Sequence, residues 1–267
     1  MAGKKSPVAC STNTYHTYSL DEALNGIAQA GFRYVELSAV PGWTEHVRLT
    51  DQPSDVRARV ESFGLKPLSM SAHSDLTTDD GVSYLLQAIP FASELGVRYV
   101  NTAIGGHASL DEDVHAFLAR TADIASAADR FDMIVTLETH GSIMASGADS
   151  LAIIQKIQSP RVRVNYDTGN VRFYGGRQPA EDLPKIMDYV AHMHLKDHIG
   201  GKANWQFPAL GRGEVAFDGV FETLSGYGYQ GPISVEIEFE GEPWPALADV
   251  DHAVAVSYEF LVSHGYA

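Results

Sequence analysis

Short, almost continuously apolar segments alternate along the chain with longer segments in which apolar residues recur at helical spacing. Near-continuous apolar runs are typical of parallel strands, because helices cover both faces of such a sheet. We expect eight strands, at Val8–Asn13, Tyr34–Val40, Leu65–Ala72, Val97–Ile104, Met133–Thr139, Val162–Asp167, Ala191–Asp197 and Ile233–Glu238. We expect eight helices, at about 19–31, 54–63, 85–95, 111–130, 148–157, 180–189, 220–224 and 249–263.

Eight strand–helix units predict an α/β fold, a single (β/α)8 TIM barrel. The 267 residues divide into units of about 33, the usual span of one strand and its helix. Ser19 and Glu22 form a capping-box pattern at the first helix, and Gly31 follows its end. No linker interrupts the pattern, so we expect one domain over residues 1–267 with a flexible N-terminus at 1–6. A doubly wound open sheet is the alternative, although the first strand–helix turn lacks its GxGxxG motif.

Composition and charge narrow the classes of partner. The chain has 19 Lys and Arg against 34 Asp and Glu, a formal net charge of −15, which argues against nucleic acid and against anionic membranes. It does not exclude a small anionic substrate. The single cysteine, Cys10, rules out an internal disulfide. We expect a cytoplasmic protein, since there is no apolar run of transmembrane length and no signal-peptide pattern.

Ligand-type side chains stand at the ends of four consecutive predicted strands. They are Glu138, Asp167, His194 and Glu236. Barrel enzymes carry their reactive groups at these carboxyl ends. Taken singly, an acid at a strand end is more often a helix cap or an ion-pair partner, and a histidine in a strand is more often packed in the core. Three carboxylates and an imidazole converging on one pocket repel each other unless a cation joins them, and the set suits Mn²⁺, Mg²⁺, Co²⁺ or Zn²⁺.

These four motifs, in this order, resemble the sugar isomerase/epimerase superfamily of xylose isomerase-like barrels. That group includes ketose 3-epimerases, inosose dehydratases, enzymes that act on 3-keto-glycosides and, more distantly, endonuclease IV. The resemblance covers essentially the whole chain and is supported by Leu210-Gly-Arg-Gly-Glu214. It implies one divalent ion, most simply Mn²⁺, on Glu138, Asp167, His194 and Glu236. His192 shares a face with His194 but lies deeper, where a core or supporting role is expected.

The resemblance also implies a mechanism. In the ketose epimerases the two metal-bound glutamates remove and return a proton through a metal-stabilised enediolate, which implies Glu138 and Glu236 as acid and base here. The same enediolate can instead expel a leaving group, which makes a lyase or dehydratase. A second alternative is a barrel that binds a sugar or a partner without turning it over.

The chain departs from the ketose 3-epimerases around these ligands. They carry a further glutamate where this chain has Met144, and a histidine where it has Asn170. His140, two residues after Glu138, is instead a candidate base, and similar Glu-x-His motifs occur in members that cleave 3-keto-glycosides and C-glycosides. The endonuclease IV branch also expects a histidine where Ala103 stands, which argues against a nuclease.

Further residues are candidates for binding substrate. They are Lys196, His73, His107, Asn170 and Glu36. A salt bridge to an acid is an equal alternative for Lys196. Trp43 and Trp205 fall in predicted loops, where one can stack on a sugar ring or form a subunit contact, and Ile199–Pro208 is a candidate lid. A homo-oligomer or hetero-oligomer is left open.

Overall fold

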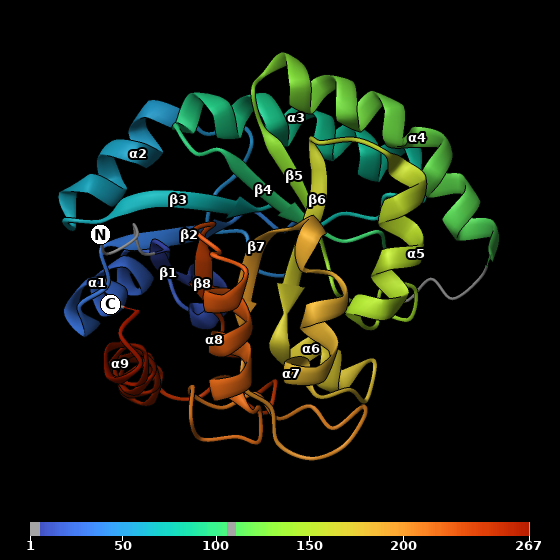
Figure 1. The fold of residues 1–267 in the computed structure, drawn as a ribbon. Coiled ribbons are helices and arrows are strands. Elements are labelled where there is room, and N and C mark those ends of the chain that lie inside the picture. Colours follow the sequence, from blue (N-terminus) through green and yellow to red (C-terminus); the bar gives the residue numbers. More distant parts are fainter. Residues whose placement is uncertain (1–5, 106–110, 267) are drawn as a thin grey trace.

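Eight parallel strands pair in chain order and close into a barrel, as the sequence predicts (Figure 1). The computed structural model describes residues 6–105 and 111–266. The strands are β1 Val8–Ser11, β2 Tyr34–Ser38, β3 Lys66–Ser71, β4 Tyr99–Thr102, β5 Ile134–Glu138, β6 Val162–Asp167, β7 Val190–Leu195 and β8 Ile233–Val235. The barrel closes where β1 pairs with β8, with Ala9 opposite Ser234.

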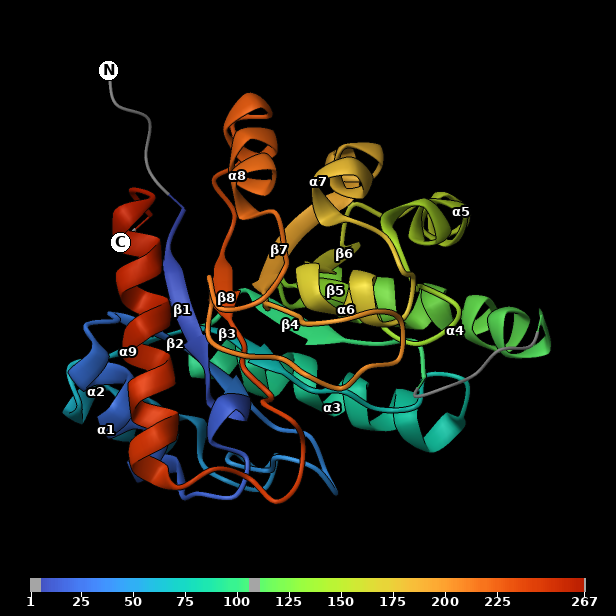
Figure 2. The ribbon, with the colours of Figure 1, turned by 90° about the horizontal axis from the view of Figure 1, so that it is seen from below.

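Helices surround the strands on the outside (Figures 1 and 2). They are α1 Leu20–Ala30, α2 Pro53–Ser62, α3 Asp79–Leu95, α4 Asp111–Arg130, α5 Gly147–Ile157, α6 Thr168–Phe173, α7 Pro179–Asp182, α8 Phe217–Gly226 and α9 Leu247–Ser263. The predicted capping box is confirmed: Ser19 Oγ accepts from the Glu22 amide, and Glu22 accepts from the Ser19 amide. Gly31 ends α1 at a φ of 108°, which only glycine adopts without strain. No helix in the described part of the chain has the length and apolar character needed to cross a bilayer.

One predicted helix was wrong, and one helix was not predicted. The expected helix at 180–189 is the short α7 followed by the 3-10 turns Leu183–Lys185 and Met187–Tyr189, because Pro184 has no amide hydrogen to continue an α-helix. The sequence also missed α6, which begins directly after β6. The Asp167 carboxylate starts it by accepting a hydrogen bond from the Asn170 amide at 2.8 Å, so one side chain ends the strand and caps the helix.

A layer of polar side chains fills the barrel below its carboxyl ends. This polar layer consists of Glu36, Ser69, Asn101, Thr136, Asn165, His192 and Ser234, one from each strand β2 to β8, and every member is fully buried. The alternate strand residues, such as Leu37 and Met193, are apolar and belong to the core that packs against the helices. Buried polar groups are stable when they are hydrogen-bonded, and the members of this layer bond largely to one another, although Asn165 Nδ2 has no partner among the described residues. The polar layer lies directly below the candidate site.

Candidate active site

A cavity of about 340 Å³ opens at the carboxyl ends of the strands, where barrel enzymes have their active sites. Its size falls within the range of small-molecule pockets. The polar lining is Asn13, Ser38, Ser71, His73, Ser74, Glu138, His140, Asn170, Lys196, Glu236 and Glu238, and the aromatic lining is Trp43, Phe173, Tyr174, Trp205 and Phe207.

The structure brings the four predicted ligand residues together. Donor atoms of Glu138, Asp167, His194 and Glu236 all lie within 4.8 Å of one another, and all four residues are buried. His194 Nδ1 lies 3.8 Å from Glu138 Oε1, 3.7 Å from Asp167 Oδ2 and 3.7 Å from Glu236 Oε2. Ligand atoms held about 2.0–2.2 Å from a single ion stand about 3–4 Å apart.

The state of two atoms at the centre of this group indicates a site for a cation. Among the described residues, Asp167 Oδ2 and His194 Nδ1 are buried with no hydrogen-bond partner, although native proteins rarely leave such atoms unsatisfied. Burial, with the charges of Glu138 and Glu236, raises the pKa of Asp167 to about 6. Burial also opposes a charge on His194, but the carboxylates around it, Glu36 first, raise its pKa well above the ordinary value. The group attracts positive charge and fits a divalent ion.

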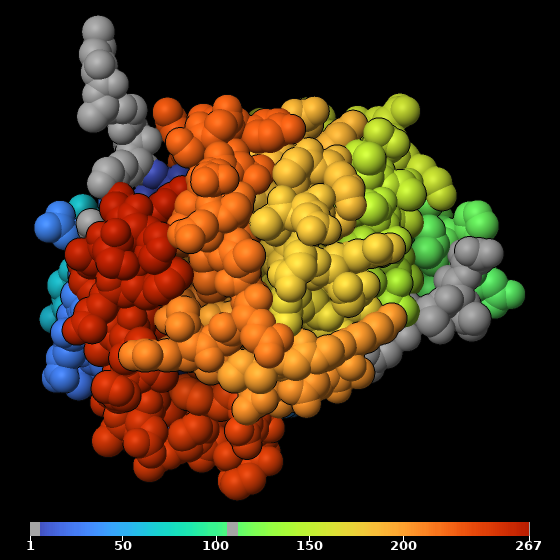
Figure 3. Space-filling model, turned by 60° about the horizontal axis from the view of Figure 1, so that its bottom comes forward, coloured from blue at the N-terminus to red at the C-terminus, as the bar shows by residue number. Residues whose placement is uncertain are grey.

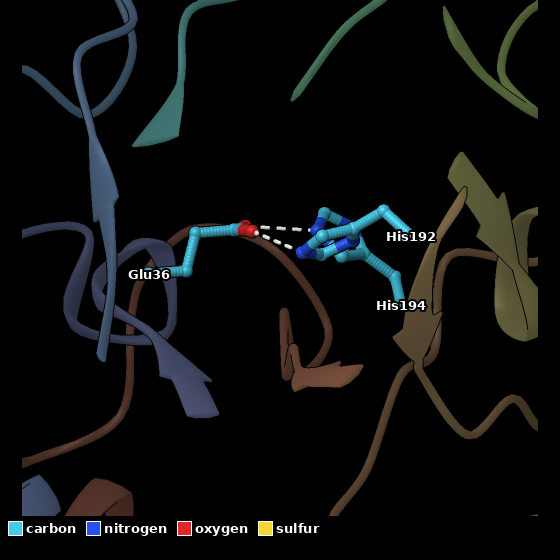
Figure 4. Close-up of side chains that lie close together, drawn as sticks. All are labelled: Glu36, His192 and His194. Atoms are coloured by element: carbon cyan, nitrogen blue, oxygen red, sulfur yellow. Dashed lines mark hydrogen bonds and ion pairs between the residues drawn. The ribbon is translucent and has the colours of Figure 1, made fainter. Parts of the chain in front are cut away.

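Glu36 holds the opposite side of the His194 ring (Figure 4). His194 Nε2 donates to Glu36 Oε1 at 2.8 Å, and His192 Nε2 lies 3.2 Å from Glu36 Oε2. When Nε2 carries the proton that Glu36 accepts, Nδ1 can present its lone pair to a bound cation, the arrangement that second-layer carboxylates impose on metal-binding histidines. Glu36 was expected to contact substrate, but the structure places it in the polar layer, fully buried and outside the cavity lining. His192 lies beside it, below His194, as predicted.

Glu138 is held at both oxygens by residues that the sequence assigned to substrate. Asn170 Nδ2 donates to Oε1 at 2.7 Å, and His73 Nε2 lies 2.9 Å from Oε2. Although burial acts in the opposite direction, His194 and His73 hold the pKa of Glu138 well below its usual range. Both Asn170 and His73 also line the cavity, so they can contact a ligand while they orient the carboxylate.

Lys196 joins two carboxylates at the other side of the site. Its Nζ lies 3.0 Å from Glu236 Oε2 and 2.5 Å from Glu238 Oε2, so the salt-bridge alternative holds. Asn13 Nδ2 donates to the second oxygen of each glutamate, at 3.0 and 3.1 Å. Burial raises the pKa of Glu238 to about 7. Each of the two glutamates is thus fixed by an amide and an ammonium group.

The model of one family, described as xylose isomerase-like TIM barrel, matches residues 24–259. The chain belongs to this family. An L-ribulose 3-epimerase of Methylomonas sp. (strain DH-1) is 27% identical over 236 residues, which are 80% of this chain and 77% of that protein. A putative L-ribulose-5-phosphate 3-epimerase of Escherichia coli (strain K12) is 28% identical over 243 residues, 81% of this chain and 83% of that protein.

Solved structures share the fold of this xylose isomerase-like barrel. A xylose isomerase domain protein from Planctomyces limnophilus superimposes with a TM-score of 0.79 at 22% sequence identity, covering 97% of both chains. This similarity confirms the architecture over almost the whole chain.

The sequence missed two residues of the site and assigned one that the structure does not describe. Both Asn13 and Glu238 line the cavity. Asn13 donates to Glu236, and Glu238 shares Asn13 and Lys196 with Glu236. Glu238 could have been predicted, because it stands two residues after Glu236 and an extended strand places both carboxylates on the same face. Nothing in the sequence pointed to Asn13 except its position after the first strand. His107 lies outside the described residues. His140 lines the cavity, with its Nε2 3.0 Å from the Tyr174 hydroxyl.

Lys196→Met is expected to lower the free energy of unfolding of the metal-free protein by about 3 kcal/mol. The substitution keeps the apolar stem but leaves Glu236 and Glu238 buried without their cation. Urea unfolding measures the change, with the exposed Lys202→Met as the matched control. An unfolding free energy equal to that of the wild type would show that the buried pair does not stabilise the site.

Proposed function

We propose that this barrel is a sugar isomerase or epimerase that acts on a keto-sugar or oxidised sugar and holds one divalent ion on Glu138, Asp167, His194 and Glu236. The observation that carries the proposal is the pair of buried atoms without hydrogen-bond partners, Asp167 Oδ2 and His194 Nδ1, facing each other among carboxylates. The oxygen-rich set suits Mn²⁺ best, with Mg²⁺, Co²⁺ and Zn²⁺ as alternatives. Relatives named as 3-epimerases of ribulose and ribulose 5-phosphate support the reaction class.

The two glutamates of the ligand set have the chemistry to move a proton. A divalent ion held by Glu138, Asp167, His194 and Glu236 would supply Lewis-acid polarisation of the substrate carbonyl group. Glu138 ends β5 and Glu236 follows β8, so they reach the cavity from different parts of the barrel wall. One removes the proton next to the carbonyl and the other delivers a proton to the opposite face, which inverts the carbon. His73 and Asn170 orient the first, and Asn13 and Lys196 orient the second.

Elimination is the second candidate, and the His140–Tyr174 pair favours it. The 3.0 Å contact between His140 Nε2 and the Tyr174 hydroxyl places an imidazole and a phenol together in the cavity lining. Such a pair can protonate a leaving group after the same proton abstraction. The protein would then be a lyase or dehydratase.

Deuterium incorporation tests the proposal and separates the candidates. Purified protein loaded with Mn²⁺ is incubated with a panel of keto-sugars in D₂O, and the products are followed by NMR. We expect deuterium at the carbon next to the carbonyl together with formation of an epimer or isomer. An unsaturated or dehydrated product would favour elimination. No exchange across the panel at full metal occupancy would reject both reactions and leave a barrel that only binds.

Glu36→Gln is expected to weaken Mn²⁺ binding about tenfold or more, the usual cost of losing a second-layer partner. A neutral amide accepts the His194 Nε2 proton less strongly than a carboxylate and makes Nδ1 a poorer ligand. Calorimetric titration of the metal-free protein with Mn²⁺ measures the affinity. Ser234→Ala is the matched control, because it removes a different hydrogen bond to Glu36, at 3.2 Å, and leaves His194 untouched. Wild-type affinity in Glu36→Gln would contradict the role.

A further inference from the structure

Apart from the divalent ion of the proposed function, the described lining of the cavity offers no free cation to an anionic substrate. Among its described lining residues, Lys196 is the only lysine or arginine, and its Nζ is already shared by Glu236 and Glu238. Glu138 lines the same space. A divalent ion would offset the charge of Glu138 and Glu236, but a phosphate group entering here would still meet Glu238 and an ammonium group that is already paired, and like-charge contacts disfavour binding.

The place where barrels commonly bind phosphate is filled by a side chain of this protein. Phosphate sites in this fold use the backbone amides of the loops after strands seven and eight. Here the loop after β7 turns its amides onto the buried Asp197 carboxylate: Oδ2 accepts from Gly211 at 2.9 Å and Gly213 at 2.8 Å, and Oδ1 from Val215 at 3.1 Å. A Cβ on Gly213 would lie 2.4 Å from Asp197 Oδ1, so the loop is shaped around this carboxylate.

The nearby guanidinium group is occupied as well. Arg172, on α6, is buried and donates from Nη2 to Glu214 Oε2 at 2.6 Å and to the Gly200 carbonyl at 3.1 Å. The amides of Gly211, Gly213 and Val215 and the guanidinium group of Arg172 are therefore paired within the protein and are not free to bind a phosphate.

Aromatic side chains form part of the cavity wall instead. Trp205 lies in the β7–α8 loop and packs edge-on against Phe173 and Phe207, with ring centroids 5.5 and 5.4 Å apart. Trp43 lies after β2, stacks on His16 at 4.0 Å and donates from Nε1 to Asn13. The tryptophans are 38% and 41% exposed although both line the cavity. Exposed aromatic rings held in place beside a pocket are typical of recognition surfaces.

The segment that carries Trp205 is fixed in place. The Ala203 amide donates to the Phe173 carbonyl at 2.9 Å, and Phe207 exchanges backbone hydrogen bonds with Phe239 at 2.6 and 2.9 Å. In Figure 3 this orange segment runs across the face of the molecule beside the yellow segment around residue 175. The Trp205 ring is therefore part of a built wall, and a ligand does not have to order it first.

We propose that the site takes an uncharged keto-sugar bearing a ring substituent that packs against the Trp205–Phe173–Phe207 wall, and that it discriminates against sugar phosphates. This substrate class rests on the proposed function of the same cavity. It differs from the phosphorylated substrate in the name of the Escherichia coli relative.

Two matched pairs of compounds test the proposal by binding and by turnover. The first pair is a ketopentose and its 5-phosphate, and the second is the methyl and phenyl glycosides of one 3-keto-hexose. Dissociation constants are measured by calorimetry on the Mn²⁺-loaded protein, and kcat/KM is measured wherever turnover occurs. We expect the phosphate to weaken binding about tenfold or more. We expect the phenyl ring to strengthen it about tenfold over methyl.

Substitutions test whether the phenyl ring of the ligand packs against Trp205. Trp205→Ala is expected to remove the phenyl preference while the affinity for the ketopentose stays within about threefold. Tyr227→Ala is the control, because it removes another exposed aromatic ring, 54% exposed, that lies on the surface outside the cavity lining. Equal binding of the phosphate and the free ketose, or a phenyl preference that survives Trp205→Ala, would overturn the proposal. The predicted binding order without any deuterium exchange would reject the reaction but keep the ligand class.

Discussion

Asp167→Asn is expected to abolish tight binding of divalent ions and, with it, catalytic activity. Losing even a second-layer partner weakens metal sites about 10- to 100-fold, and this substitution removes a charged ligand whose Oδ2 has no other partner among the described residues. Calorimetry and the metal content after gel filtration measure the loss. Asp188→Asn is the control, because this exposed carboxylate lies just before β7 on the outside of the barrel.

The effect of Asp167→Asn on the melting temperature should depend on whether Mn²⁺ is present. A ligand present at about 100 times its dissociation constant stabilises the folded state by about 2.7 kcal/mol, so Mn²⁺ should raise the melting temperature of the wild type by about 5 °C or more. The variant should show no such rise. In EDTA the variant should be at least as stable as the wild type, because asparagine removes a buried charge that Glu138 and Glu236 repel. A melting temperature that still rises with Mn²⁺ would contradict the ligand set.

The strand ends could be predicted from the sequence, because near-continuous apolar runs alternate with segments in which apolar residues recur at helical spacing. Apolar runs mark the strands, and in a parallel barrel all their carboxyl ends meet at one rim. Glu138 and Asp167 are the last residues of β5 and β6, and His194 stands one residue before the end of β7, so the three had to converge. Glu236 follows the shortest strand, β8, and still reaches the cluster because the chain continues along the barrel wall.

The depth of a side chain within the barrel and its ion-pair partners could not be predicted from the sequence. The strand period shows that Glu36 faces the barrel interior, but not that it lies one layer below the cavity, since depth depends on the stagger between β2 and β7. The place of Lys196 was right, while its two partners depend on where the chain runs after β8. Asn13 reaches the site from the 3-10 turn Thr12–Tyr15 after β1, and Trp43 from the loop after β2. The conformation of such connections follows from tertiary contacts that a single sequence does not display.

Glu138→Gln and Glu236→Gln are expected to lower kcat for interconversion of two epimers by about 10²- to 10⁴-fold, the usual contribution of a positioned acid or base. Both carboxylates belong to the ligand set, so the rates are compared at saturating Mn²⁺ with the metal content of each variant measured. Glu240→Gln is the control, because Glu240 is an exposed glutamate at the same end of the barrel whose side chain accepts from Gln206. It should keep the wild-type rate.

Deuterium exchange by the two glutamine variants tests their roles more sharply than the rate. If the glutamates serve opposite faces of the substrate carbon, Glu138→Gln still has Glu236 to remove and return the proton on one face. That variant should exchange deuterium into one epimer without forming the other, and Glu236→Gln should exchange into the opposite epimer. Exchange into the same epimer by both variants would assign both steps to one group, with His140 in the cavity lining as a candidate for it. Loss of exchange in both variants, with Mn²⁺ still bound, would mean that each step requires both carboxylates and that a two-face mechanism is wrong.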